Sequence, residues 1–373
     1  MDKHLHIVTH EIPWPVRHGG YTDLYFKIVE LHKKGIKIHL HCFRKDPNRE
    51  EKELLKYCVS IHYYNRRTGF KGISLSLPYI VQSRKSDELE INLCKDRYPV
   101  LLEGVHCTAL LYKGALIDRN VVVRLHNVEY KYYNQLARSE KNILKKIYYF
   151  NESRLLKKYE KYISQKCIFL SVSSKDAEVY QDEFKASITF VPVFHPYSEV
   201  SSLPGKGSFC LYHGNLSVSE NEKAAEWLLR EVFDGMSIPF VIAGKDPSAS
   251  LTHLVESKAN TCLVANPSQE EMHDLINKAQ INIIPSFNDT GVKLKLLNAL
   301  FNGRHSLLNL SAVNGSGLDK LCNLADRATQ FKEKISKLYN ESLTNQQTDE
   351  RKIILSEIYD NEKNARLLIS LIW

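Results

Sequence analysis

The sequence predicts an α/β protein made of two doubly wound, Rossmann-like domains that face a central cleft. Short apolar runs of strand length alternate with longer segments in which apolar residues recur at helical spacing. Strands that are apolar almost throughout are typical of parallel sheets with helices on both faces. The alternation breaks once, at residues 194–207, where two prolines, two glycines and three serines indicate a linker.

Residues 1–193 are the expected N-terminal, acceptor-side domain. Its strands are predicted in seven β-rich runs, which are HLHIVTH, KIHLHCF, VSIHYYN, VLLEGV, NVVVRLH, KCIFLSVS and ITFVPV. After the first of these, the segment DLYFKIVELHKKG has the spacing of a helix that stops at Gly35.

Residues 208–350 are the expected C-terminal domain, with a helix predicted in NEKAAEWLLREVF. Its strands are predicted in SFCLYHGN, PFVIAG, TCLVAN, INIIPS and HSLLNL. Residues 351–373 are predicted to form one amphipathic C-terminal helix that packs back on the N-terminal domain. The apolar residues at helical spacing in it are Leu355, Ile358, Leu367, Leu368 and Leu371.

The composition favours a cytoplasmic protein with an anionic partner. The 373 residues contain no apolar stretch near the ~20 residues that span a bilayer, and the N-terminus shows no signal-peptide pattern. Eight scattered cysteines without a C-x-x-C pair are typical of free thiols in a reducing compartment. Residues 1–200 carry 33 Lys and Arg against 23 Asp and Glu, so the net charge of +8 belongs to this half. A phosphorylated substrate, a membrane surface or nucleic acid would match that charge.

Several familiar patterns are missing from the sequence. There is no G-x-x-x-x-G-K-[ST] loop and no well-formed G-x-G-x-x-G, which argues against an ATPase and a simple dehydrogenase. There is no G-x-S-x-G elbow, and no His, Cys and Asp residues have metal-ligand spacing, so no metal site is expected.

A polar cluster follows one predicted strand in the N-terminal half. In VVVRLHNVEYKYYNQL, the apolar run leads directly into Arg124, His126, Asn127 and Glu129. Parallel sheets bind ligands beyond the carboxyl ends of their strands, so His126 stands where a ligand is expected. A single histidine is otherwise more often structural.

Two glycine-containing loops also follow strands. In EIPWPVRHGG, Gly19 and Gly20 would let the backbone approach a ligand, with Arg17 beside them, although such a pair is often only a tight turn. In LYHGNLSVSE, Gly214 and Asn215 follow the first strand of the second domain.

The stretch PSFNDTGVKLKLLNALF predicts a site for phosphate. Asp289 or Thr290 could cap a helix whose first-turn amides Gly291 leaves open, and Lys293 and Lys295 add positive charge. The alternative is a capped surface helix with solvated lysines, because such helix starts are common.

These four segments, in this order, resemble the GT-B glycosyltransferases, and in particular the large retaining family of bacterial mannosyl- and glucosyltransferases known as glycosyltransferase group 1. EIPWPVRHGG is similar to the family's glycine loop, and VVRLHNVEYKYY to its strand-end histidine segment. HGNLSVSENEKAAEWLLREV resembles the opening of the donor domain, and IIPSFNDTGVKLKLLNALF the nucleotide-sugar loop and helix. The resemblance covers nearly the whole chain.

The resemblance implies an enzyme that uses a UDP- or GDP-linked sugar, retains configuration and needs neither metal nor cofactor. It implies a catalytic role for His126 and an acceptor-side location for Arg17, Arg124, Asn127 and Glu129. It implies a surface-glycan acceptor, either a saccharide or a lipid-linked one. The residues that it places around the donor are Gly19, Gly20, Gly214, Asn215, Lys245, Thr290, Gly291, Val292, Lys295 and Asn298.

The chain departs from this family at four donor positions. Asn215 and Glu220 stand where the family has an Arg and a Lys after the first donor-domain strand. Thr290 and Asn298 stand where the family usually has glutamates, and the neutral amide of Asn298 would bond a ribose hydroxyl less strongly than a carboxylate. The alternative function is therefore a catalytically weak or inactive GT-B protein that binds a sugar nucleotide or scaffolds glycan assembly.

The segment EKNILKKIYYFNESRLLKKYEKY interleaves lysines with aromatic residues. It suggests a helix at the inner face of the membrane, or equally a solvated helix with buried aromatics. No nucleic-acid recognition motif accompanies the positive charge, so nucleic acid is not an expected partner.

Overall fold

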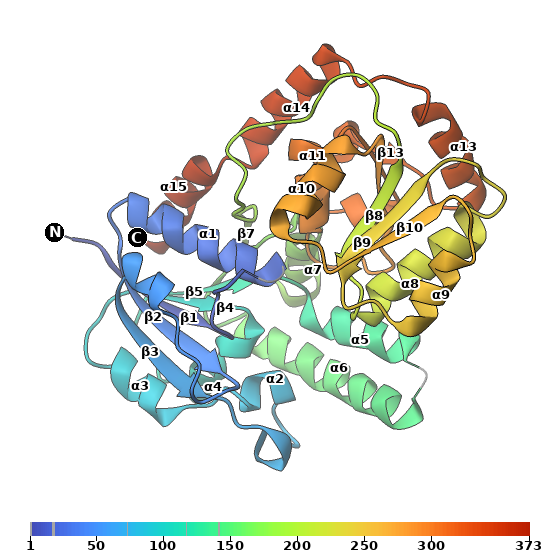
Figure 1. Ribbon diagram of the computed structural model, residues 1–373. Helices are drawn as coiled ribbons and strands as arrows, with labels where there is room; N and C mark the ends of the chain where they lie inside the picture. The colour runs from blue at the N-terminus through green and yellow to red at the C-terminus, as the bar shows by residue number, and fades with distance from the viewer. Residues whose placement is uncertain (1, 17–18, 73, 117, 141) are drawn as a thin grey trace. The chain divides into compact units, whose positions relative to one another are not determined.

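The structure is a computed structural model that describes residues 2–16, 19–72, 74–116, 118–140 and 142–373. The chain divides into two compact units (Figure 1). Unit 1 contains residues 1–196 and 359–373, and unit 2 contains residues 197–358.

Unit 1 is built on a seven-stranded parallel sheet with the strand order β3-β2-β1-β4-β5-β6-β7. Its strands are β1 (His4–Thr9), β2 (Lys37–Arg44), β3 (Cys58–Asn65), β4 (Val100–Glu103), β5 (Val121–Leu125), β6 (Ile168–Ser171) and β7 (Ile188–Phe190). The order reverses between β1 and β4, which is the arrangement that places ligands at the carboxyl ends of the neighbouring strands. All seven predicted strands are present.

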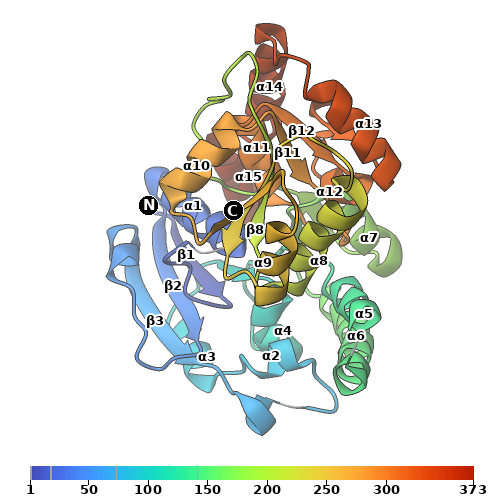
Figure 2. The ribbon, with the colours of Figure 1, turned by 45° about the vertical axis from the view of Figure 1, so that its right-hand side comes forward.

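Two groups of helices cover the two faces of this sheet. The helices α1 (Gly19–Lys33) and α15 (Asn361–Ile372) lie side by side and bury Ile28, Leu31 and Leu368 against one face (Figure 1). The other face is covered by α2 (Tyr79–Gln82), α3 (Asp87–Leu93), α4 (Ala109–Lys113), α6 (Ile143–Ile163) and α7 (Ser174–Phe184). A further helix, α5 (Glu129–Ser139), runs beside α6 (Figure 2).

Unit 2 repeats this architecture with a six-stranded parallel sheet in the order β10-β9-β8-β11-β12-β13. Its strands are β8 (Cys210–Asn215), β9 (Phe240–Lys245), β10 (Thr261–Ala265), β11 (Ile281–Ile284), β12 (His305–Leu308) and β13 (Asn323–Leu324). The first five were predicted, whereas the two-residue strand β13 was not, because it is too short to have a pattern of its own.

The helices of unit 2 are α8 (Ser219–Trp227), α9 (Ala249–Glu256), α10 (Gln269–Lys278), α11 (Leu294–Asn302), α12 (Leu310–Val313), α13 (Ala328–Leu338) and α14 (Asn345–Ile358). One core joins the sheet to α8, α9 and α13, and Phe331 and Leu228 are fully buried in it. The strands β8 and β9 approach closely at their carboxyl ends. A Cβ on Gly244 would lie 2.0 Å from the carbonyl oxygen of Gly214, so the end of β9 needs glycine at this position.

The boundaries between the units differ from the expected ones. The predicted linker at residues 194–207 is split, because residues from Tyr197 onward are part of unit 2. There, Ser201 donates its N–H to the carbonyl of Phe301, and Gly205 pairs with Leu343. The prolines and serines of this segment suggested a flexible linker, but backbone hydrogen bonds hold its second part against unit 2.

The predicted single helix at residues 351–373 is also corrected. It is two helices, because α14 ends at Ile358 and Asp360 caps the separate helix α15 with its carboxylate. The helix α14 belongs to unit 2, and α15 packs on the sheet of unit 1. The apolar spacing continued through the break because both helices bury apolar residues.

Among the described residues, no helix combines the length and the apolar character needed to cross a bilayer. All eight cysteines have free thiols.

Candidate functional site

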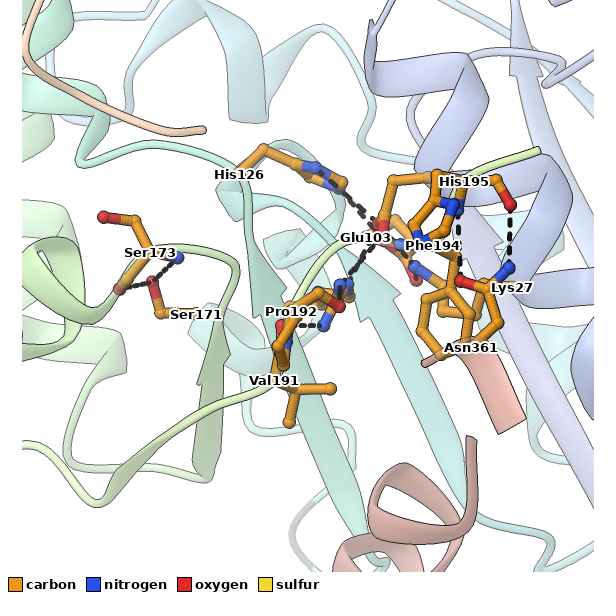
Figure 3. Close-up of polar contacts among 12 residues, drawn as sticks. Lys27, Glu103, His126, Ser171, Ser173, Val191, Pro192, Phe194, His195 and Asn361 are labelled. Carbon is orange, nitrogen blue, oxygen red and sulfur yellow. Dashed lines mark hydrogen bonds and ion pairs between the residues drawn. The ribbon is translucent and has the colours of Figure 1, made fainter. Parts of the chain in front are cut away.

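The carboxyl ends of β4 and β5 in unit 1 carry a buried network of charged side chains (Figure 3). The guanidinium of Arg124 donates two hydrogen bonds to the carboxylate of Asp23 on α1, at 2.9 and 3.0 Å. Lys27, one helical turn after Asp23, places its Nζ 3.0 Å from Asp23 Oδ2 and 2.7 Å from Glu103 Oε1. These four side chains are at most 1% exposed, and their two positive and two negative charges balance.

His126 is the partly exposed end of this network. Its Nε2 lies 3.1 Å from Glu103 Oε2, and its Nδ1 lies 3.9 Å from Asp23 Oδ2. The side chain of His126 is 16% exposed. The sequence predicted a functional histidine at this strand end, and the structure shows that two carboxylates border its ring.

The carboxylates of Asp23 and Glu103 and the ring of His126 lie close enough to resemble a metal site, with ligand atoms within 4.8 Å of one another. The ammonium of Lys27 contacts both carboxylates, however, and Arg124 takes both oxygens of Asp23. These cations supply the positive charge that a metal would bring, so the donor set does not fit a divalent ion.

The network keeps both acids ionised. Burial alone would raise the pKa of Asp23, but Arg124 and Lys27 outweigh burial and hold its pKa well below the ordinary value. Burial likewise opposes ionisation of Glu103, yet Lys27 and the hydrogen bond from His126 lower its pKa. The pKa of Arg124 is raised, since Asp23 outweighs its burial.

Arg124 is therefore not placed as predicted. It was expected on the acceptor side, but its side chain is fully buried and also donates to the carbonyls of Val191 and Pro192 at 3.1 and 2.9 Å. The position at a strand end suggested access to ligand. The sequence could not show that Asp23, a hundred residues away, holds the guanidinium inside.

Glu129 is also buried, at the start of α5, among other acids. The carboxylate of Glu160 on α6 accepts the backbone N–H groups of Glu129 and Tyr130 at 3.0 and 3.1 Å, and the hydroxyl of Tyr180 at 2.7 Å. Glu160 thus caps the helix that begins directly after the His126–Asn127 loop. Burial and the neighbouring Glu160 raise the pKa of Glu129 to about 8, and burial raises the pKa of Glu160 to about 7.

Glu129 is consequently a structural acid in this unit rather than an acceptor contact, because it is 4% exposed. Its carboxyl accepts a hydrogen bond from Asn127, which is partly exposed.

The glycine pair of the first loop opens α1, since Gly19 and Gly20 are its first two residues. Asp23 and Lys27 follow on the same helix, so the loop leads into the helix that carries half of the charge network. Arg17, predicted beside the glycines, lies outside the described residues.

In unit 2, the loop between β11 and α11 has a fixed geometry that differs from the predicted one. The helix begins at Leu294 after Lys293, not at Gly291, so neither Asp289 nor Thr290 caps it. Gly291 has φ +65°, a left-handed conformation that favours glycine. The capping pattern was misleading because the loop takes its own turns before the helix starts.

Side-chain hydrogen bonds shape this loop from within. The carboxamide oxygen of Asn288 accepts from both the N–H and the hydroxyl of Thr290, at 2.9 Å each, and Thr290 is 3% exposed. The ammonium of Lys293 donates to the carbonyl of Thr290 at 2.7 Å. Ser286 and Asn309 exchange two hydrogen bonds, at 2.9 and 2.7 Å, which join the ends of β11 and β12.

Lys295 was predicted to bring positive charge to this edge, and the structure shows which side chains surround it. Its Nζ lies 5.0 Å from the ring centre of Tyr212 on β8. Burial lowers the pKa of Lys295 to about 8, and Glu220 of α8 opposes that shift. The neighbouring His213 is buried and neutral, because burial and Lys295 lower its pKa to about 3.

The other predicted donor residues are spread along the same sheet edge. Gly214 and Asn215 end β8, and Asn215 accepts from the N–H and the hydroxyl of Ser217. Val292 is partly buried in the loop, and Asn298 on α11 accepts from Asn302 at 2.7 Å. Lys245 is 65% exposed and lies 3.7 Å from Asp246.

The sequence analysis missed Asp23, Lys27, Glu103 and Glu160. Three of these had a usable signal: Asp23 and Lys27 are opposite charges at i,i+4 spacing in one helix, and Glu103 ends the apolar run VLLE. Glu160 lies in a lysine-rich segment and could not be told from a surface acid.

Two sequence comparisons indicate which known proteins this chain is similar to. Residues 208–341 match the family model described as "Glycosyl transferases group 1". A Klebsiella pneumoniae protein, described as an uncharacterized 44.6 kDa protein in the cps region, is 29% identical over 312 residues, which cover 79% of this chain and 80% of the relative.

Solved glycosyltransferase structures share the whole fold. Sucrose-phosphate synthase from Thermosynechococcus elongatus has a TM-score of 0.70 and 14% identity, and the match covers 99% of this chain and 98% of that one. TarM has a TM-score of 0.72 and 11% identity, over 99% and 98% of the two chains. An E. coli structure described as trehalose-6-phosphate bound with UDP-2-fluoro glucose has a TM-score of 0.66 and 10% identity, over 99% of each. The predicted GT-B fold is confirmed.

The buried acids of α5 and α6 predict a pH-dependent stability. Glu129 has a folded pKa of about 8 against an ordinary 4.5, so the folded protein binds more protons than the unfolded chain between these values. The free energy of unfolding should therefore fall as pH rises from about 4.5 to 8. Glu129→Gln should remove this loss and exceed the wild type at pH 8 by on the order of 1 kcal/mol or more.

Urea unfolding at pH 5 and pH 8 checks this prediction, with the exposed Glu178→Gln on the neighbouring helix as the control. If Glu129→Gln changed the stability equally at both pH values, the buried carboxyl would not hold a proton as described.

Proposed function

Because residues 208–341 match the group 1 glycosyltransferase family model and the whole chain has the GT-B fold, we propose that the protein is a glycosyltransferase that uses a nucleotide-diphosphate sugar as its donor. The sugar passes to a saccharide or lipid-linked acceptor in surface polysaccharide synthesis. The bond between the anomeric carbon and the diphosphate breaks, a bond to an acceptor oxygen forms, and the acceptor hydroxyl releases its proton.

The observation that carries this proposal is the partly buried cation at the carboxyl edge of unit 2. Lys295 lies within the family-matched residues, beside a loop whose glycine has positive φ and whose side chains bond one another. A preformed loop with one poorly solvated ammonium stabilises a leaving diphosphate better than a solvated lysine does, because the charges interact in a low dielectric. Lys295, Gly291 and Val292 are the proposed diphosphate contacts.

His126 is the proposed catalytic residue of unit 1. Supporting this role, its ring is partly exposed at a strand's carboxyl end while its Nε2 is bonded to Glu103. We propose that transfer retains configuration and requires neither metal nor cofactor. The ammonium and guanidinium that already neutralise Asp23 and Glu103 support metal independence.

The acceptor class and the donor base rest on the relatives. The Klebsiella relative is described by its position in the cps region, which supports a polysaccharide acceptor. One structural relative is described as bound to a UDP-sugar analogue, which makes UDP the first base to test and GDP the second. Free thiols throughout support a cytoplasmic location.

A second candidate function is sugar-nucleotide binding with little or no turnover. The hydroxyl of Thr290 is engaged by Asn288, and Asn298 accepts from Asn302. Both side chains are therefore in use within unit 2 and are neutral, so neither supplies a carboxylate to a donor ribose or sugar.

We further propose that unit 1 contacts an anionic membrane surface through the first turns of α6. Residues 142–148 are exposed all round, and the apolar side chains that face solvent in the first turns of this helix are Ile143, Leu144, Ile147, Tyr148 and Phe150. The exposed Lys145 and Lys146 lie between them, and Arg154, Lys157, Lys158 and Lys161 continue along the helix. Apolar side chains flanked by lysines suit the headgroup region of an anionic bilayer.

The first prediction of this proposal is selective nucleotide binding. In a thermal-shift screen with UDP, GDP, ADP and their common sugars, one nucleotide should raise the melting temperature saturably. With that donor, His126→Ala should abolish measurable transfer while the protein stays folded, whereas the exposed His32→Ala should retain transfer.

Binding and turnover separate the candidate functions. Selective binding with transfer supports the enzyme, and selective binding without transfer to any glycan tested supports the second candidate. The absence of a shift with every nucleotide, on folded protein, would contradict both.

Lys295 predicts the pH dependence of donor binding. Its pKa of about 8 means that the ammonium is lost above this pH, so affinity for the nucleotide diphosphate should fall as pH rises from 7 to 9. Lys295→Met should weaken binding at pH 7 about 10- to 100-fold, which corresponds to loss of one charged hydrogen bond. Titration calorimetry measures both effects, and the exposed Lys278→Met is the matched control. Unchanged binding in Lys295→Met would remove this residue from the site.

Vesicle sedimentation tests the membrane contact. The protein should bind vesicles that contain phosphatidylglycerol and release them at high salt, since lysines supply part of the attraction. Ile147→Asp should weaken binding about 10-fold or more, because an apolar side chain loses its burial. Ile353→Asp, at a residue that is also exposed but lies on α14 of unit 2, should have no effect. Equal loss in both variants would contradict a contact through α6.

A further inference from the structure

The charged side chains of unit 1 form a chain of contacts that ends at His126. Asp23 holds Lys27, Lys27 holds Glu103, and Glu103 accepts the hydrogen bond from His126 Nε2. Since Glu103 is ionised, it can only accept, and the proton must lie on Nε2 of the histidine. The network therefore specifies one tautomer of His126 and leaves Nδ1 without a proton in the neutral ring.

The far end of the network is fixed to the two segments where the chain passes between its units. Asp23 Oδ1 accepts the N–H of Phe194 at 2.8 Å (Figure 3). The next residue, His195, exchanges two hydrogen bonds with Asn361, at 3.2 and 2.7 Å, and its Nε2 lies 2.6 Å from the carbonyl oxygen of Tyr359. The chain leaves unit 1 after Pro196 and returns at Tyr359, so both passages are tied to each other and to Asp23.

From this geometry we propose that Glu103, Lys27 and Asp23 are positioning residues, which fix the ring and the tautomer of His126 relative to the two segments that leave unit 1. The inference deepens the proposed function, because it rests on a catalytic role for His126. None of the three residues is itself proposed to touch substrate, since all are buried.

Energetics favour a positioning role over a purely stabilising one. Removing four charges from water costs several kcal/mol per ion, and well-packed apolar side chains often stabilise a fold as well as a buried ion network does. A directional chain of charged hydrogen bonds supplies something that apolar packing lacks, which is a unique orientation for the group at its end.

The test uses a variant that breaks the chain without leaving an unpaired charge. Lys27→Met with Glu103→Gln removes one positive and one negative charge and leaves the Asp23–Arg124 pair balanced. In the wild type, the ring ¹⁵N shifts of His126 should show the Nε2–H tautomer, and in the double variant they should show a mixture of both tautomers. The kcat for transfer should fall about 100-fold, as expected for a misplaced catalytic group, while the KM for the donor stays within about twofold.

A second variant covers the case in which the double variant does not fold. Glu103→Asp keeps every charge but withdraws the acceptor by one bond, about 1.5 Å, and should shift the tautomer ratio in the same direction. Asp96→Asn is the control, because Asp96 bonds His6 of the same sheet at 3.0 Å. It should lower stability and leave both the His126 tautomer and kcat unchanged.

The two measurements separate this inference from the proposed function. If the His126 shifts keep the Nε2–H pattern in both Glu103 variants, the positioning role is wrong, whatever the activity. If the tautomer changes and the wild-type protein transfers no sugar, the positioning chain stands and the catalytic role of His126 fails.

Discussion

The balance of four buried charges is the constraint on which the carboxyl edge of unit 1 depends. The carboxylate of Asp23 contacts the side chains of Arg124 and Lys27 and accepts the backbone N–H of Phe194. The helix α1, the strand β5 and the segment after β7 therefore meet at this one carboxylate. Removing one partner would leave an uncompensated charge inside the sheet, which costs about 3–5 kcal/mol. His126 lies at the exposed end of this arrangement and takes its orientation from it.

The corresponding edge of unit 2 is built on a different principle. Its loops are held largely by amides and hydroxyls, as in the pair Ser286 and Asn309, together with the ammonium of Lys293. The poorly solvated ammonium of Lys295 adds a second positive charge, and a preformed loop with these two cations suits a dianionic leaving group. The edge of unit 1 therefore uses ion pairs to orient His126. The edge of unit 2 presents positive charge that would pair with a bound diphosphate.

The helix α6 combines two features that are separate in most helices. Its first turns expose apolar side chains and lysines, whereas its buried end provides Glu160, which caps α5 behind the His126 loop. The acids around Glu160 hold protons near neutral pH because they are buried together. The buried acids thus fix the start of α5 but lower the stability of unit 1, and this loss of stability grows as pH rises.

The sequence by itself determined the alternation of strands and helices, and with it the two parallel sheets, the carboxyl edge of unit 1 that carries His126 and the corresponding edge of unit 2 near Lys295. The spacing of apolar residues and the length of apolar runs are local properties of the sequence, so they can be recognised without knowledge of the fold. Only the tertiary structure decided that Arg124 and Glu129 turn inward, that α11 starts at Leu294, and that α14 and α15 belong to different units. The inward turn of Arg124 and Glu129 depends on partners distant in sequence, Asp23 for Arg124 and Glu160 for α5, and burial rather than residue type determines which charges face solvent.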